Sequence, residues 1–215
     1  MAGRTIVVDP GHNGVWTTAL NRQVPAGNGR TKPCNSSGTA AGRYAEHAFN
    51  WDLASVLVTQ LRDLGAKVVL TRSNDHGSGP CVNIRAQITN DAKPDALVSL
   101  HADGNLAKGA RGYHFIISST MVGGSAVERQ SRALATQLRN ALDDGTDLPR
   151  STYIGGGTGI HARTDIAGLN LIRVPGVMLE VGNMRNAADL ALQRSPAFRK
   201  AVATSIAKGL VRWLD

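Results

Sequence analysis

The stretch VVDPGHNG, residues 7–14, passes abruptly from two valines into a turn that contains Pro10 and Gly11. Valines suit a buried strand, and a Pro-Gly pair ends one. A strand that stops in such a turn brings the next side chain, here that of His12, to the edge of a sheet, where it can meet solvent, substrate or metal. This stretch therefore predicts a strand with a histidine just beyond its carboxyl end.

Four more apolar runs predict strands, and helical patterns separate or follow them. Apolar side chains recur at helical spacing over residues 49–64, 133–142 and 198–213, and Ser195 and Pro196 are a typical start for the last helix. Strands that alternate with helices predict an α/β fold, with a largely parallel sheet and helices on both of its faces. A chain of 215 residues with 42% hydrophobic content suits a single domain. The five predicted strands are residues 5–8, 67–71, 96–101, 112–118 and 176–181.

Two stretches rich in Gly, Thr, Asn and Ser, residues 13–42 and 143–167, do not fit this alternation. We predict the first to be a loop or hairpin insert and the second a long loop, because long loops in compact domains are commonly functional. The second contains IGGGTGI, residues 154–160, which lacks the lysine of a phosphate-binding loop and is predicted to be flexible.

Charge and cysteine content narrow the classes of partner and compartment. The 24 Lys and Arg residues against 16 Asp and Glu residues favour an anionic partner, but 4% aromatic content and dispersed basic residues argue against nucleic acid. No apolar stretch is long enough for a transmembrane segment.

Cys34 and Cys81 lie in polar, turn-rich segments, which favours a surface disulfide and an oxidising compartment. The first strand begins at Thr5 and leaves no room for a signal peptide, so either the protein is cytosolic or its leader has been removed. The expected disulfide favours the second alternative, and we expect an exported protein.

Three side chains are candidates for a metal site. His101 is the last residue of the predicted strand 96–101, and His12 follows the end of the first strand. If these two strands are parallel neighbours, both imidazoles lie at the same edge of the sheet. Glu46 lies in the first turn of a helix and points along the face of Phe49. His47, about 100° further round that helix, is the second choice.

Glu180 places a carboxylate at the end of the apolar run GVMLEV. Desolvation there would raise its pKa unless the carboxylate is paired, and pairing to an arginine is the structural alternative. A desolvated glutamate beside a metal site suits a general base. Two imidazoles and one carboxylate in turn form a zinc site of the catalytic type, with a fourth position open.

At these residues the chain resembles the zinc-dependent N-acetylmuramoyl-L-alanine amidases, which cut stem peptides from the glycan of peptidoglycan. The resemblance spans residues 5–214, and it implies one zinc ion bound by His12, Glu46 and His101, with Glu180 as catalytic acid and base. It also implies a mixed six-stranded sheet flanked by helices. The segments that carry the resemblance, in chain order, are VVDPGHNG, Glu46, VVLTRSND, VNIRAQITND, SLHAD and VPGVMLEVGNMRN.

The chain departs from that family after the catalytic glutamate, where Asn183 and Met184 follow Gly182 in place of the usual phenylalanine. No repeated wall-binding module is attached, so we expect this domain alone to bind peptidoglycan or muropeptide. We also expect a monomer. Two alternatives stay open. Another zinc hydrolase such as a carboxypeptidase would use the same groups, and a non-enzymatic basic module would bind an anionic polymer without zinc. If Glu180 is not the acid and base, His161 is the next residue to test.

Overall fold

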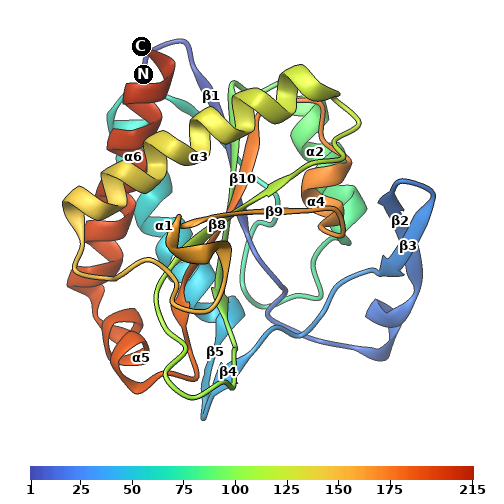
Figure 1. Ribbon diagram of the computed structural model, residues 1–215. Helices are drawn as coiled ribbons and strands as arrows, with labels where there is room; N and C mark the ends of the chain where they lie inside the picture. The colour runs from blue at the N-terminus through green and yellow to red at the C-terminus, as the bar shows by residue number, and fades with distance from the viewer.

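A six-stranded sheet lies at the centre of the computed structural model, which describes residues 1–215 (Figure 1). The strand order is β6-β1-β7-β10-β8-β9, and the first four strands run parallel to one another. β8 is antiparallel to β10, and β9 is parallel to β8, so the predicted mixed and largely parallel sheet is confirmed. The strands are β1 Thr5–Pro10, β6 Lys67–Leu70, β7 Ala96–Asp103, β8 His114–Ser118, β9 Ile160–Arg163 and β10 Gly176–Asn183.

Helices cover both faces of this sheet, as predicted (Figure 1). The long helices α1, α3 and α6 lie on one face, and α2 with the short α4 lies on the other. Ser195 caps α6 by accepting a hydrogen bond from the N–H of Phe198, and Pro196 occupies its first turn. None of the helices combines the length and the apolar character that crossing a bilayer requires. The helices are α1 Glu46–Asp63, α2 Val82–Ala92, α3 Ser125–Gly145, α4 Ala167–Asn170, α5 Ala187–Arg194 and α6 Pro196–Leu214.

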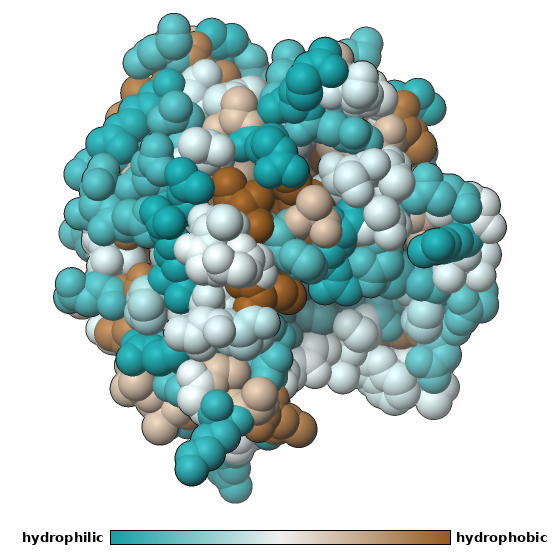
Figure 2. Space-filling model, in the orientation of Figure 1, coloured by the Kyte–Doolittle hydropathy of each residue, from teal (hydrophilic) through white to brown (hydrophobic).

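A hairpin projects from the body at the right of Figures 1 and 2. In the chain it follows the first strand and precedes α1. Strands β2 Gln23–Gly27 and β3 Arg30–Pro33 form it, joined by Asn28 and Gly29. Both connecting residues have positive φ, of 56° and 68°, which is the backbone that an Asn-Gly hairpin turn adopts. The surface of this lobe is mostly hydrophilic or neutral (Figure 2).

The rest of the stretch around the hairpin holds only short elements. These are the 3₁₀ turn η1 Thr18–Asn21 and the two-residue strands β4 Ala40–Ala41 and β5 Tyr44–Ala45, which pair with each other.

The prediction of one long loop over residues 143–167 is wrong. Helix α3 continues to Gly145, and Ile160–Arg163 forms β9 at the edge of the sheet. Gly155–Gly157 forms a 3₁₀ turn, η2, in which all three residues have positive φ and therefore favour glycine.

Cys34 and Cys81 form a disulfide between the end of the hairpin and the start of α2. The expectation of a surface disulfide is wrong in its placement, because both cysteines are buried against Leu20 and Val24. Asn170 of α4 also donates a hydrogen bond to the carbonyl of Ala26 on the hairpin, at 2.9 Å. The hairpin is thus fastened to both α2 and α4.

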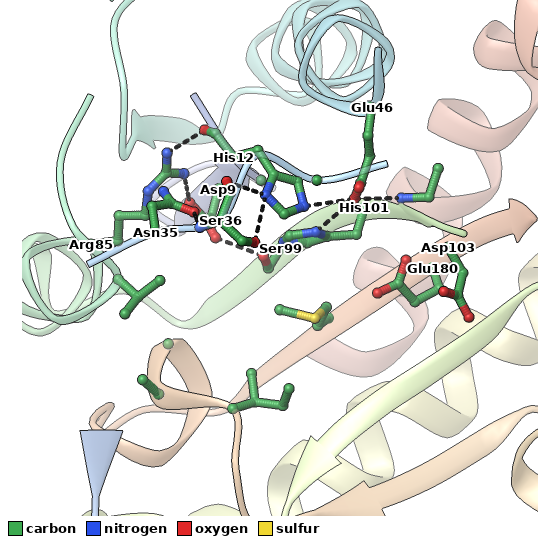
Figure 3. A pocket seen from close by; sticks show the side chains of 18 of the residues that line it. Asp9, His12, Asn35, Ser36, Glu46, Arg85, Ser99, His101, Asp103 and Glu180 are labelled. Carbon is green, nitrogen blue, oxygen red and sulfur yellow. Dashed lines mark hydrogen bonds and ion pairs between the residues drawn. The ribbon is translucent and has the colours of Figure 1, made fainter. Parts of the chain in front are cut away.

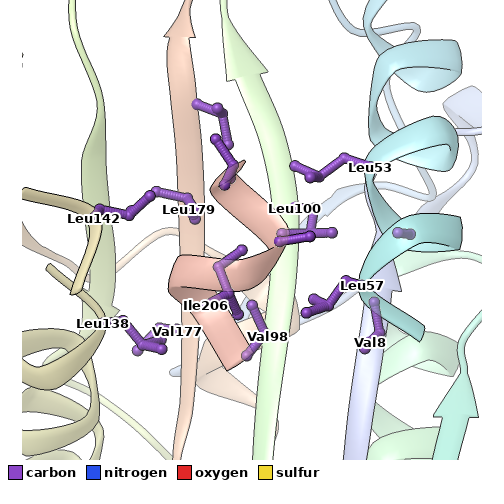
Figure 4. Close-up of a cluster of buried hydrophobic side chains, with 14 of the residues drawn as sticks. Val8, Leu53, Leu57, Val98, Leu100, Leu138, Leu142, Val177, Leu179 and Ile206 are labelled. Atoms are coloured by element: carbon purple, nitrogen blue, oxygen red, sulfur yellow. The ribbon is translucent and has the colours of Figure 1, made fainter. Parts of the chain in front are cut away.

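The strands sort their side chains between two faces because consecutive residues point in opposite directions. On β7 and β10, His101 and Glu180 face the side of α2 and α4 (Figure 3). Leu100 and Leu179 face the other side, where they pack in the main core (Figure 4). Each fully buried leucine contributes roughly 1.5–3 kcal/mol to folding. The first face therefore combines a smaller apolar cluster with the polar groups of the site, and the second carries the main core.

Candidate active site

His12, Glu46 and His101 meet where β1, β7 and α1 come together (Figure 3). One ligand atom from each residue lies within 4.8 Å of the other two. His12 Nε2 is 2.9 Å and His101 Nδ1 is 3.0 Å from the same oxygen, Glu46 Oε1. The sequence-predicted trio is thus brought together, with three donor atoms directed at one small volume.

The Glu46 carboxylate is held by main-chain N–H groups as well as by the histidines. Its Oε2 accepts the N–H of Thr39 at 2.9 Å, and its Oε1 accepts that of Ala102 at 3.2 Å. The N–H of Glu46 itself donates to the carbonyl of Thr39. Burial alone would raise the pKa of Glu46, but His12 and His101 hold that pKa well below its usual range. Glu46 is therefore a fixed, ionised carboxylate.

His12 is held in an unusual backbone conformation. Its φ is 60°, in the left-handed region that residues other than glycine seldom adopt. Its Nδ1 lies 3.0 Å from the carbonyl of Ser36, which can only accept a hydrogen bond, so Nδ1 carries the proton. Burial alone would lower the pKa of His12, but the Glu46 carboxylate, 2.9 Å from Nε2, raises it. A metal ion at this point would take the place of the proton on Nε2, and the hydrogen bond at Nδ1 is of the kind that orients a metal-binding histidine.

Two glycines allow the chain to approach this site closely. A Cβ atom at Gly11 would clash with the ring of His101, and one at Gly38 would lie 2.7 Å from Glu46 Oε2 and 2.8 Å from His12 Cδ2. Both positions need glycine for reasons of space.

Arg85, from α2, anchors the segment that carries His12. Its guanidinium donates to the carbonyl of His12 at 2.5 Å and to Asn13 Oδ1 at 2.6 Å. It also pairs with Asp9 Oδ1 at 2.6 Å. Burial alone would raise the pKa of Asp9, but Arg85 together with the Ser99 and Thr71 hydroxyls lowers it to about 2. Sequence reasoning gave no role to Arg85 or Asp9, although VNIRAQITND contains the arginine.

Arg72 plays a similar part on the other side of the segment. It donates to the carbonyls of Pro10 and His47, both at 2.9 Å, and pairs with Asp75 at 2.7 Å. His47, the second-choice ligand, directs its Nδ1 to the carboxylate of Asp75 at 2.9 Å. The structure does not bring His47 to the ligand cluster.

Glu180 lies beside His101 because the two residues are register partners on β10 and β7. It forms no ion pair, and its Oε2 is buried without a hydrogen-bond partner. Burial raises the pKa of Glu180 well above its usual value, and the nearby carboxylates of Glu46 and Asp103 raise it further. Figure 3 shows the carboxylates of Glu180 and Asp103 next to each other. The arginine pairing considered from the sequence is absent, and the carboxyl group favours its protonated form.

A cleft of about 720 Å³ joins these groups, a volume in the range of pockets that bind small ligands. His12, Glu46, His101 and Glu180 all line it. His161 does not line it, because it lies on β9, two strands away from the strand of Glu180. The cleft runs beneath the hairpin, where Figure 2 shows the molecule hollowed between that lobe and the body.

Asn183 has a structural role at the point where the chain departs from the family pattern. Its side chain is buried and donates to the carbonyls of Asn105 and Ala110, at 2.9 and 2.8 Å. The N–H of Asn183 donates to Asp189 at 3.0 Å. A polar anchor for the segment after β7 thus occupies this position.

Comparison with known proteins agrees with this fold and cleft. The model of the N-acetylmuramoyl-L-alanine amidase family matches residues 6–212. An N-acetylmuramoyl-L-alanine amidase of Mycobacterium tuberculosis is 40% identical over 216 residues, covering 100% of this chain and 88% of that protein.

Two solved structures are also similar over nearly the whole chain. The apo form of the N-acetylmuramyl-L-alanine amidase Ami1 from Mycobacterium abscessus has a TM-score of 0.94 and 43% identity, covering 100% of both chains. Ami1 from Mycobacterium smegmatis has a TM-score of 0.94 and 42% identity, covering 99% of this chain and 97% of that one. The chain therefore belongs to the N-acetylmuramoyl-L-alanine amidase family and is an enzyme of that class.

Proposed function

We propose that this amidase depends on one zinc ion per chain, held by His12, Glu46 and His101. On this proposal it hydrolyses the amide bond between N-acetylmuramic acid and L-alanine in peptidoglycan, with Glu180 as acid and base. The observation that carries the proposal is the convergence of three donor atoms within 4.8 Å beside an unpartnered, desolvated carboxyl group.

The donor set fits zinc. Two imidazole nitrogens and one carboxylate oxygen are typical of catalytic zinc sites, which leave a fourth position for water or substrate. Burial lowers the pKa of His101 and so favours the neutral imidazole that binds metal. The hydrogen bond from His12 to Ser36 fixes the other imidazole in the matching tautomer.

Bound zinc would polarise the scissile carbonyl and make water a better nucleophile. The charge of a bound metal ion would favour the ionised form of Glu180, and in that form Glu180 takes a proton from the attacking water as the new C–O bond forms at the carbonyl carbon. It then gives that proton to the nitrogen of L-alanine as the C–N bond breaks. The products are a carboxylate on the lactyl group of the sugar and a stem peptide with a free amino terminus. A pKa raised by burial suits a group that must both accept and donate this proton.

We also infer that the protein acts outside the cytoplasm, in the periplasm or cell wall, and as a monomer. Its substrate lies outside the cytoplasm, and a disulfide between Cys34 and Cys81 persists in oxidising compartments. One chain supplies every residue of the proposed site.

Mass spectrometry of digested peptidoglycan tests the reaction. The expected products are stem peptides that begin with free L-alanine, and a chelator should abolish their release until zinc is restored. Stem peptides shortened only at their carboxyl ends would instead indicate a carboxypeptidase. Full activity in the chelated protein would contradict the zinc requirement.

A further inference from the structure

The cleft continues from the proposed metal site along the sheet, into an inner arm between α2 and α4. Its floor is Leu97 and Met178. Leu97 lies four residues before His101 on β7, and Met178 lies two residues before Glu180 on β10. We use "inner arm" for this part of the cleft. The remaining apolar residues that line it are Val82, Ala86, Ile166, Ala167 and Leu169.

Different elements line the two ends of the cleft. At the strand ends, the lining includes Gly104 and the exposed side chain of Arg185. The inner arm passes beneath β3 of the hairpin, which contributes Lys32 and Pro33 to its wall. A glycan strand continues on both sides of each sugar and needs open surface, whereas a stem peptide is a short branch. The leaving peptide must also lie next to Glu180, which is two residues from Met178 on β10.

Only three lysine or arginine side chains line the cleft, and Lys32 differs from the other two in its contacts. Arg85 is engaged by Asp9 and the His12 segment, and Arg185 is exposed. Lys32 is partly buried and forms no ion pair, and its Nζ donates only to the carbonyl of Asp165, at 3.3 Å. The Asp165 carboxylate is already paired with Arg163 at 2.6 Å.

An ammonium group has three protons to donate, and one that is partly removed from water is stabilised by an anion. Burial lowers the pKa of Lys32, which is consistent with a cation that lacks a full set of partners. Lys32 also lies only four residues before Ser36, which contacts His12, so one short segment joins it to the proposed metal site.

We propose that the inner arm binds the stem peptide and that Lys32 pairs with the free α-carboxylate of the acidic residue that follows L-alanine. This inference rests on the proposed function and adds a specificity determinant to it. Where that carboxylate is amidated, the substrate loses the charge that Lys32 would recognise.

A two-by-two comparison tests this assignment. The parent and Lys32→Met are each given two muropeptides that differ only in whether this α-carboxylate is free or amidated. We expect Lys32→Met to lower kcat/KM for the free carboxylate by about tenfold or more, mainly through KM, because the contact is present before and during the reaction. For the amidated substrate, the two proteins should agree within about twofold. Lys32→Arg keeps the charge and should restore the preference.

Arg30→Met removes a charge from the same strand, outside the cleft, and is the matched control that should behave as the parent. An equal loss on both substrates in Lys32→Met would overturn the assignment, because a structural defect does not depend on the carboxylate. The assignment would also be overturned if the preference for the free carboxylate disappeared in Arg185→Met and persisted in Lys32→Met. If the parent releases no stem peptide from either substrate, the proposed function itself fails, and this inference fails with it.

Discussion

Arg85 holds His12 through the main chain, because its guanidinium donates to the His12 carbonyl at 2.5 Å while the imidazole faces the other way, toward Glu46. The left-handed backbone of His12 is thus held by a side chain from helix α2. The ligand cluster depends on an arginine that offers no ligand atom.

Arg85→Lys should therefore weaken zinc binding without removing a ligand. Lysine keeps the positive charge beside Asp9 but lacks the planar fork that reaches several acceptors at once. We expect zinc affinity to fall by about 10- to 100-fold, the usual effect of losing a group that orients a ligand. Titration against a competing chelator measures this. Arg129→Lys, on the exposed face of α3, is the control, and unchanged affinity in Arg85→Lys would refute the orienting role.

His101→Ala should lose both zinc and activity, because it removes one of three donor atoms from the cluster. Metal analysis of the purified variant, together with release of stem peptide, provides the test. His76→Ala removes an exposed histidine and should retain both properties. Normal zinc content in His101→Ala would exclude His101 from the site.

Glu180→Gln should separate metal content from turnover. Glutamine keeps the shape of the side chain but cannot carry the proton, and loss of a general base costs about 10² to 10⁴ in rate. The variant should bind zinc as the parent does. The chain has only three glutamates, so Glu128→Gln, on α3, is a natural control. Activity within a few-fold of the parent would move the acid and base role elsewhere, with His161 the next residue to substitute.

Acid should destabilise the protein partly through Asp9. Its pKa is about 2 in the folded state against an ordinary value of 3.8, so its ionised form stabilises the fold above pH 4. That contribution, about 2 kcal/mol, is lost as the pH falls from 3.8 through 2. The free energy of unfolding should therefore drop less steeply between pH 4 and 2 in Asp9→Asn than in the parent. Identical slopes would show that Asp9 is not the group concerned.

Reduction of the Cys34–Cys81 disulfide should lower the free energy of unfolding by about 4 kcal/mol, the chain-entropy value for cysteines 47 residues apart. Urea denaturation with and without reductant measures the difference. The Cys34→Ala/Cys81→Ala variant should match the reduced parent and should not respond to reductant. A parent that is equally stable in both conditions would contradict the expectation.

Much of the fold was predictable because its core elements have strong periodic patterns. The run ALVSLH and the stripe through Phe49 and Leu53 are long enough to identify a strand and a helix. β9 was missed because it has only four residues and follows a glycine-rich turn. The antiparallel direction of β8 has no local signal, since strand direction is set by how the chain crosses the sheet.

The convergence of His12, Glu46 and His101 was also predictable, because histidines at strand ends and a glutamate at a helix start are visible in the sequence. The groups that hold them were not. Arg85 and Asp9 are separated by 76 positions, and nothing local indicates that an arginine on α2 becomes buried against a strand-end carboxylate. The importance of Thr39 is likewise invisible, because its main-chain N–H makes the contact with Glu46.

The two ends of the chain lie next to each other in Figure 1, and Arg4 donates to the carbonyl of Leu214 at 3.2 Å. His12 follows the opposite end of β1, and that six-residue strand separates it from the chain ends by roughly 20 Å. The molecule is therefore suited to circular permutation, in which a short linker joins the present ends and new ends open in a surface turn such as Asn28-Gly29. A reporter or affinity module fused at either present end would likewise sit well away from the entrance of the cleft.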